Sequence, residues 1–94
     1  LLIIDVQYRT FGTRPAPFWD AIEEFPTSCG EVGWRAVTHI RRLLDLFRER
    51  RWPVLYPHVA PKEGFDAGRL AEKVPALITV ARHGYDFVAE VAPQ

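Results

Sequence analysis

The sequence predicts an α/β domain in which a parallel sheet is flanked by helices. The first observation behind this prediction is the opening run Leu1-Leu2-Ile3-Ile4, which is apolar at four consecutive positions. Because alternate side chains of a strand point to opposite faces, such a run suits a strand that helices cover on both sides. The second observation is the order of the segments that follow, a long amphipathic helix and then another short apolar run. A strand, a helix and a strand in this order form a βαβ unit with a right-handed crossover.

Composition limits the size and the class of the protein. The 94 residues suit one small domain, and a hydrophobic content of 48% indicates a globular chain. A formal net charge of zero argues against a dedicated nucleic-acid-binding protein. The single cysteine, Cys29, allows no internal disulfide and favours the reducing cytoplasm. The sequence has no apolar run of membrane-spanning length and no basic start of a signal peptide, so no membrane partner is expected.

The two ends of the sequence predict a portion of a larger domain. The first residues already lie inside the expected strand, and the chain closes on the loop-like tail Ala92-Pro93-Gln94. We therefore expect residues 1–94 to be the N-terminal portion of a single domain. A buried parallel strand needs a neighbour on each edge, so the isolated chain is expected to aggregate or to form oligomers.

A loop and a short helix are predicted between the first strand and the long helix. Residues 8–17 contain a glycine and two prolines, which interrupt regular structure. A long loop at the carboxyl end of a strand is a suitable wall for a site. Apolar residues recur at helical spacing over 18–25 and predict a short helix that ends before Pro26.

The long helix is predicted to run from the neighbourhood of Ser28 to about Arg50. Ser28 and Glu31 have the spacing of a capping box, in which each side chain accepts a hydrogen bond from a free backbone N–H. Arg51 stands where glycine often ends a helix, so a left-handed or irregular end is expected there. One apolar stripe for packing recurs at spacings of three and four. It consists of Trp34, Val37, Ile40, Leu44 and Phe47.

A second strand is predicted over 53–59, and prolines at both ends keep it short. It should place His58 near the same carboxyl edge as Asp5. The remaining segments are predicted as a loop over 60–69, a helical turn over 70–74, an apolar run of undecided type over 76–80, and a loop over 84–94 anchored by Phe87, Val88 and Val91.

Asp5 follows the opening apolar run at the point where the strand should end. In open α/β sheets, ligands bind at the carboxyl ends of the strands. A buried charge without a partner is strongly disfavoured, so a carboxylate at this point needs a reason. The residues alone leave two interpretations open, a catalytic carboxylate and a carboxylate that caps a strand–loop junction.

Four segments in this order resemble the isochorismatase-like cysteine hydrolases. The run LIIDVQ at 2–7 is similar to the first strand of that family, and PVLY at 53–56 is similar to the second. The segment SCGEVGW at 28–34 resembles the N-carbamoylsarcosine amidase branch, and FVAEVAP at 87–93 resembles the loop before the third strand. The resemblance covers essentially the whole chain but only about the first half of a family member.

The resemblance implies a catalytic set of an aspartate, a lysine and a cysteine. It places the aspartate on Asp5, as the general base that takes the proton of the thiol. Neither Lys62 nor Lys73 occupies the matching place, and Cys29 is not the family's nucleophile. The lysine and the nucleophilic cysteine would therefore lie beyond Gln94, and the chain alone should be inactive.

The implied reaction is hydrolysis of a small amide or ureido bond through a cysteine thioester. By resemblance Phe11 and Gln7 belong to the substrate-binding set, with Gln7 better suited to a structural hydrogen bond beneath the site. The implied partner is a small-molecule amide, and a homo-oligomer is expected for the full-length protein. Two alternatives stay open, vinyl-ether hydrolysis as in isochorismatase itself and a noncatalytic interaction module built on the βαβ unit.

No metal and no other cofactor is expected. Nicotinamidase-like relatives bind a metal with an Asp-x-His group near His58, but the residue two before it is Tyr56 rather than an acid. His39 falls on the long helix and His83 in a loop, without ligand spacing between them.

Overall fold

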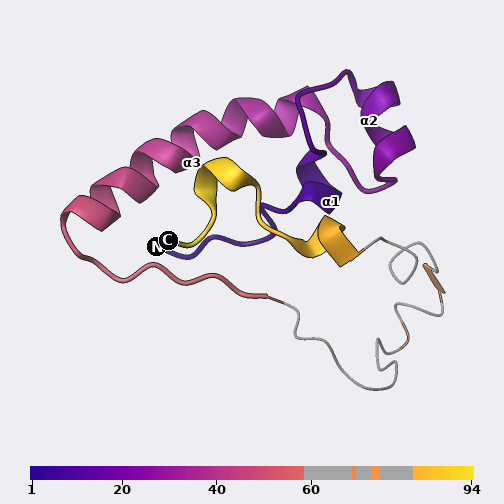
Figure 1. The fold of residues 1–94 in the computed structure, drawn as a ribbon. Helices are drawn as coiled ribbons and strands as arrows, with labels where there is room; N and C mark the ends of the chain where they lie inside the picture. The colour runs from indigo at the N-terminus through magenta and orange to yellow at the C-terminus, as the bar shows by residue number, and fades with distance from the viewer. Residues whose placement is uncertain (59–68, 70–72, 75–81) are drawn as a thin grey trace.

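The computed structural model describes residues 1–58, 69, 73–74 and 82–94 (Figure 1). Its longest element, α3, packs against α1 and against the C-terminal turn η2. The extended segments on either side of α3 run below it in Figure 1. The helices and turns in order are α1 (Tyr8–Phe11), α2 (Phe18–Glu24), α3 (Glu31–Glu49) and the 3-10 turns η1 (Arg82–Tyr85) and η2 (Ala89–Val91).

The prediction of a parallel sheet flanked by helices is wrong, because the described part of the chain holds isolated bridges and no sheet. Leu2 pairs with Leu55 in the parallel sense, and Gln7 pairs with Phe87 in the antiparallel sense. In the first pairing, the Ile3 N–H donates to the Leu55 carbonyl at 2.9 Å. The two segments that were expected to be strands thus touch at one point without forming a ladder.

Two local features keep the first extended segment short. Pro53 and Pro57 have no N–H to donate, so the partner segment offers a narrow window for pairing. Asp5 adopts a φ of 56°, in the left-handed region, which interrupts the extended backbone after Ile4. The alternation of burial breaks at the same place, since Ile4 and Asp5 are both exposed and Val6 is buried.

Four of the five residues in the predicted apolar stripe of α3 face the core, while Phe47 packs against Trp52. Val37 and Leu44 are buried, while Trp34 and Ile40 pack against the core from its border. Burial of one face of a long helix is the main source of its stability. The buried core cluster comprises Ile3, Val6, Phe11, Val37, Leu44, Val88 and Val91.

The predicted capping box at the start of α3 is wrong. The helix begins at Glu31, its N-cap is Gly30, and the Ser28 hydroxyl accepts a bond from the Gly30 N–H at 3.2 Å. The Glu31 N–H instead donates to the Ala16 carbonyl at 2.8 Å. Gly30 has a φ of 60°, and a Cβ on it would lie 2.8 Å from that same Ala16 oxygen. The Ala16 carbonyl, which lies close to the backbone of Gly30 and accepts the Glu31 N–H, therefore takes the place of the predicted side-chain cap.

Of the left-handed or irregular end expected for α3, the structure shows the left-handed form at Arg51, whose φ is 54°. The Arg51 N–H donates to the Arg48 carbonyl at 3.0 Å, and the Trp52 N–H donates to the Phe47 carbonyl at 2.9 Å. These two bonds form a Schellman motif, which satisfies carbonyls that a helix end leaves free. The rings of Phe47 and Trp52 meet edge to face at 5.2 Å and add the apolar contact that often accompanies the motif.

The predictions for the shorter elements are confirmed in part. The short helix predicted over 18–25 is present as α2, and the buried Val88 and Val91 anchor the C-terminal segment as expected. The loop predicted over 8–17 is wrong for its first four residues, which form α1. The predictions for 60–69, 70–74 and 76–80 lie outside the described residues, except at Arg69, Lys73 and Val74.

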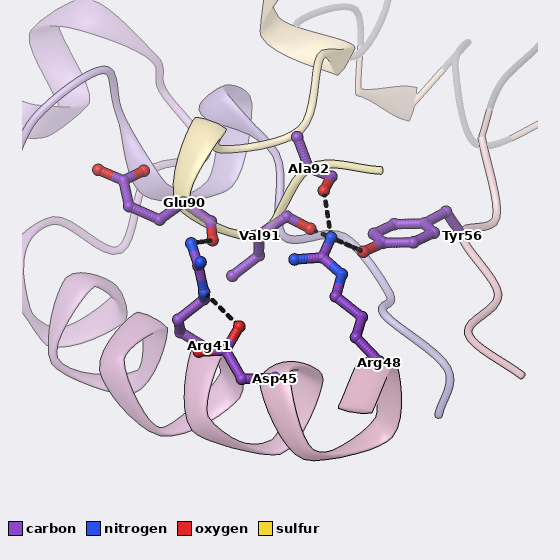
Figure 2. A network of polar contacts seen from close by, with 7 residues as sticks. All are labelled: Arg41, Asp45, Arg48, Tyr56, Glu90, Val91 and Ala92. Atoms are coloured by element: carbon purple, nitrogen blue, oxygen red, sulfur yellow. Dashed lines mark hydrogen bonds and ion pairs between the residues drawn. The ribbon is translucent and has the colours of Figure 1, made fainter. Parts of the chain in front are cut away.

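The C-terminal segment is fastened to α3 and to the second extended segment by side chains that bind its backbone (Figure 2). Arg41 and Arg48 project from α3, and Tyr56 belongs to the extended segment. Since each donor bonds a backbone oxygen of residues 90–92, we call the three side chains the carbonyl clasp. The bonds run from Arg41 to Glu90 (2.8 Å), from Arg48 to Ala92 (2.7 Å) and from the Tyr56 hydroxyl to Val91 (2.9 Å).

Arg51→Gly is expected to raise the free energy of unfolding by about 1 kcal/mol, because glycine adopts the left-handed conformation without a Cβ penalty. The matched control is Arg50→Gly, since Arg50 has a right-handed φ of −79° and gains nothing from glycine. Urea denaturation followed by circular dichroism measures both variants. A lower stability for Arg51→Gly than for Arg50→Gly would contradict this account of the helix end.

Arg48→Met is expected to lower the free energy of unfolding by about 1–2 kcal/mol, because a partly buried charged donor is removed from the Ala92 carbonyl. Arg42→Met is the control, since Arg42 is exposed on the same helix. Hydrogen exchange at the Val91 amide should accelerate in the first variant and stay unchanged in the second. Equal exchange rates in the two variants would show that the carbonyl clasp does not hold the segment.

Candidate functional site

Asp5 lies where the first extended segment turns into α1. Its φ of 56° is uncommon for a residue other than glycine, although aspartate adopts it more readily than most. The side chain is 62% exposed, so the carboxylate is not the buried charge that a strand inside a sheet would have made it. The backbone conformation, rather than burial, distinguishes this position.

Arg9 is the charged partner of Asp5. Arg9 Nη2 donates to Asp5 Oδ1 at 3.0 Å, and Arg9 Nε donates to Gln7 Oε1 at 2.9 Å. The guanidinium carbon lies 5.1 Å from the centre of the Tyr85 ring, in cation–π range. With 18% of its side chain exposed, Arg9 is held by a carboxylate, an amide and an aromatic face at once. We call Asp5, Gln7, Arg9 and Tyr85 the Asp5 cluster.

Gln7 lies in the interior beneath Arg9. It is 2% exposed, and its backbone carbonyl accepts bonds from the N–H groups of Thr10 and Phe11, both at 3.0 Å, at the start of α1. The bridge to Phe87 fixes it from the other side. The structure thus joins Gln7 to Asp5 through Arg9 and gives it no face toward a bound molecule.

Phe11 lies in the core rather than beside Asp5. It is 8% exposed and belongs to the buried cluster under α3. Its carbonyl accepts a bond from Trp34 Nε1 at 2.7 Å, which ties α1 to α3. Of the three residues that the resemblance assigns to the site, Gln7 is linked to Asp5 through Arg9, while the side chain of Phe11 belongs to the buried core.

Cys29 has a structural role near the start of α3. Its Sγ donates to the Thr10 carbonyl at 3.0 Å, and its N–H donates to the same oxygen at 2.8 Å. Among residues 1–58, 69, 73–74 and 82–94, no three His, Cys, Asp or Glu side chains gather as metal ligands do. His58 and His83 instead lie against the rings of Phe87 and Phe25.

A shallow apolar depression of about 250 Å³ lies along the first extended segment and α3. Leu2, Ile4 and Leu43 on its border are each about half exposed. Asp5 is not among the residues that line it, so the depression and the Asp5 cluster are separate features. The lining residues are Leu1, Leu2, Ile3, Ile4, Val6, Ile40 and Leu43.

The sequence indicated Asp5 but missed Arg9 and Tyr85. The four-residue separation of Asp5 and Arg9 was no usable signal, because Asp5 lies before the start of α1 with a left-handed φ and the helical spacing rule does not apply to it. The position of Tyr85 depends on a contact between distant parts of the chain and has no local signal.

Comparisons with family models, with curated proteins and with solved structures find no match for the chain. None of the helices in the described part of the chain is long and apolar enough to cross a membrane. The geometry of the Asp5 cluster and the resemblance in the sequence are therefore the basis for a functional proposal.

Asp5→Val is expected to lower the free energy of unfolding by about 1–2 kcal/mol, because a β-branched residue strongly resists a positive φ. Asp5→Asn should cost less, since asparagine also tolerates the left-handed region. Asparagine can still accept the hydrogen bond from Arg9 and valine cannot, so the difference between the two variants contains the loss of this bond as well as the cost of the backbone conformation. Thermal unfolding of the two proteins measures it, and equal losses would contradict the assigned conformation.

Proposed function

We propose that this chain supplies the catalytic aspartate of an isochorismatase-like cysteine hydrolase that acts on a small amide or ureido bond. The observation that carries the proposal is Asp5 itself, an exposed carboxylate in a left-handed backbone conformation with one oxygen fixed by Arg9. Residues in sparsely populated conformations concentrate at functional sites. The resemblance of 2–7 and 53–56 to the family supports the same assignment.

The chemistry explains why such a carboxylate is needed. An amide is a poor electrophile, so its hydrolysis is divided into thiolate attack and hydrolysis of a thioester. In this proposal Asp5 takes the proton of the thiol as the sulfur bonds to the carbonyl carbon, and returns it to the nitrogen as the C–N bond breaks. Water then cleaves the thioester and restores the thiol, with Asp5 as the base for that water.

The thiol and the lysine of the proposed set come from polypeptide outside these 94 residues. Cys29 does not serve as the nucleophile. Its thiol donates a hydrogen bond to the Thr10 carbonyl, and the resemblance does not match Cys29 to the nucleophilic cysteine of the family. Gln7 acts through Arg9, and Phe11 supports α1 from the core. The proposed reaction needs no metal or other cofactor, since the thiolate is the nucleophile. We further propose that the full-length protein is a cytoplasmic homo-oligomer.

A noncatalytic interaction module is the second candidate. The observation in its favour is the apolar surface made by Leu2, Ile4, Leu43 and Leu55, each exposed to 51–62%. Exposed apolar residues that gather on one surface are common where another protein binds. This candidate predicts that Asp5 can be replaced without functional consequence.

The test uses the product of the natural reading frame that contains these residues and measures ammonia release from small primary amides and ureido compounds. Asp5→Asn should lower kcat by about 10²- to 10⁴-fold, the usual contribution of a general base. The control is Asp20→Asn, an exposed carboxylate at the start of α2.

Three results would count against the hydrolase proposal. The first is full activity in the Asp5→Asn protein, and the second is a reading-frame product that hydrolyses none of these compounds. The third is ammonia release by the 94-residue chain alone above a no-enzyme control, because the proposal leaves that chain without a nucleophile.

A further inference from the structure

We infer that Arg9 is the positioning residue of Asp5, and that the buried Gln7 fixes the direction of Arg9. The inference rests on the proposed function of Asp5 for its catalytic meaning, while the geometry behind it can be tested separately. The resemblance assigns no role to Arg9, so the structure alone points to it.

The guanidinium of Arg9 has a fixed internal geometry. The group is planar and rigid, and its N–H donors keep fixed directions relative to one another. Because Nε is bonded to Gln7 Oε1 at 2.9 Å, the direction of the Nη2 donor toward Asp5 Oδ1 at 3.0 Å is set as well. A lysine ammonium at this position could not fix two acceptors in the same way.

Gln7 and Tyr85 form a rigid support for the Arg9 side chain. Gln7 is buried and paired through its backbone to Phe87, so its amide oxygen is a fixed point. The Tyr85 ring covers the guanidinium from η1. That turn is tied to α1 by the Tyr8 N–H, which donates to the Asp86 carbonyl at 3.1 Å.

The supported Arg9 side chain in turn restricts the carboxylate of Asp5. An ordinary surface ion pair is mobile and contributes about 0–1 kcal/mol, because two long side chains must be ordered to form it. Here the contacts of Arg9 with Gln7 and Tyr85 order its side chain independently of Asp5. Arg9 occupies Oδ1, and none of the described residues bonds Oδ2. In this proposal Oδ2 is the atom that accepts the proton, because Oδ1 already accepts a hydrogen bond from Arg9.

The structural test measures the χ1 rotamer of Asp5 by NMR coupling constants in the product of the natural reading frame that contains these residues. One rotamer is expected in the wild type, and averaging over several is expected in Arg9→Met and in Arg9→Lys. Arg14→Met is the matched control, because Arg14 is exposed in the loop after α1, and it should leave the single rotamer intact. A single rotamer in Arg9→Met, or averaging in the wild type, would overturn the inference.

A second measurement needs no substitution and so does not depend on the folding of a variant. Phenylglyoxal modification of the wild type, followed by mass spectrometry of peptides, should be several-fold slower at Arg9 than at Arg14. Equal rates at the two arginines would show that Arg9 is not held, and would overturn the inference.

The catalytic test uses the active reading-frame product. Both Arg9→Met and Arg9→Lys should lower kcat by about 10- to 100-fold with little change in KM, the loss expected when a reacting group is misplaced by about 1 Å. An unchanged kcat in Arg9→Met, where Asp5→Asn is inactive, overturns the inference and leaves the proposed function standing. If no amide is hydrolysed at all, the proposed function fails, and the rotamer and modification results still decide whether Arg9 orients Asp5.

Discussion

The left-handed backbone of Asp5 is the constraint on which the rest of the structure depends. It turns the chain so that Val6 and Gln7 enter the interior directly after two exposed residues. Val6 then accepts a bond from the Val88 N–H at 3.1 Å, and Gln7 starts α1 and holds Arg9. A continuous extended strand would bury every second residue, so after Ile3 it would turn Asp5 inward and Val6 outward, the opposite of the burial observed.

The buried core joins the two ends of the described chain to α3. Val88 and Val91 are fully buried, and they lie in one cluster with Ile3, Val6 and Leu44. Burial of this cluster stabilises the fold mainly through apolar area removed from water. The Asp5 cluster is thus supported by a packed core to which segments distant in the sequence contribute.

What could be predicted from the sequence was the part that depends on neighbouring residues. The stripe of α3 and the left-handed conformation at Arg51 follow from local spacing and chain geometry, and both were predicted correctly. The capping box failed because the approach of Ala16 to Gly30 takes precedence over the side-chain cap, and no local pattern reports that approach. The sheet failed because a ladder needs partner strands, and an apolar run does not specify how many it will find.

The residues of the candidate site, too, could be predicted only where their signal is local in the sequence. The sequence indicated Asp5 because this residue ends an apolar run. The sequence did not indicate that the side chain is exposed, since exposure depends on which segments of the chain cover it. Arg9 was missed because its importance comes from the burial of Gln7 and from the Tyr85 ring, which a single sequence does not place.

The carbonyl clasp has an evolutionary consequence. Its three donors bind main-chain oxygens, which every amino acid carries, so the attachment does not depend on which side chains occupy residues 90 and 92. Those two positions can drift among homologues while the tail stays fastened, whereas Arg41, Arg48 and Tyr56 cannot be exchanged as freely. Selection at this end of the molecule should therefore act on the donors and leave the segment they hold variable.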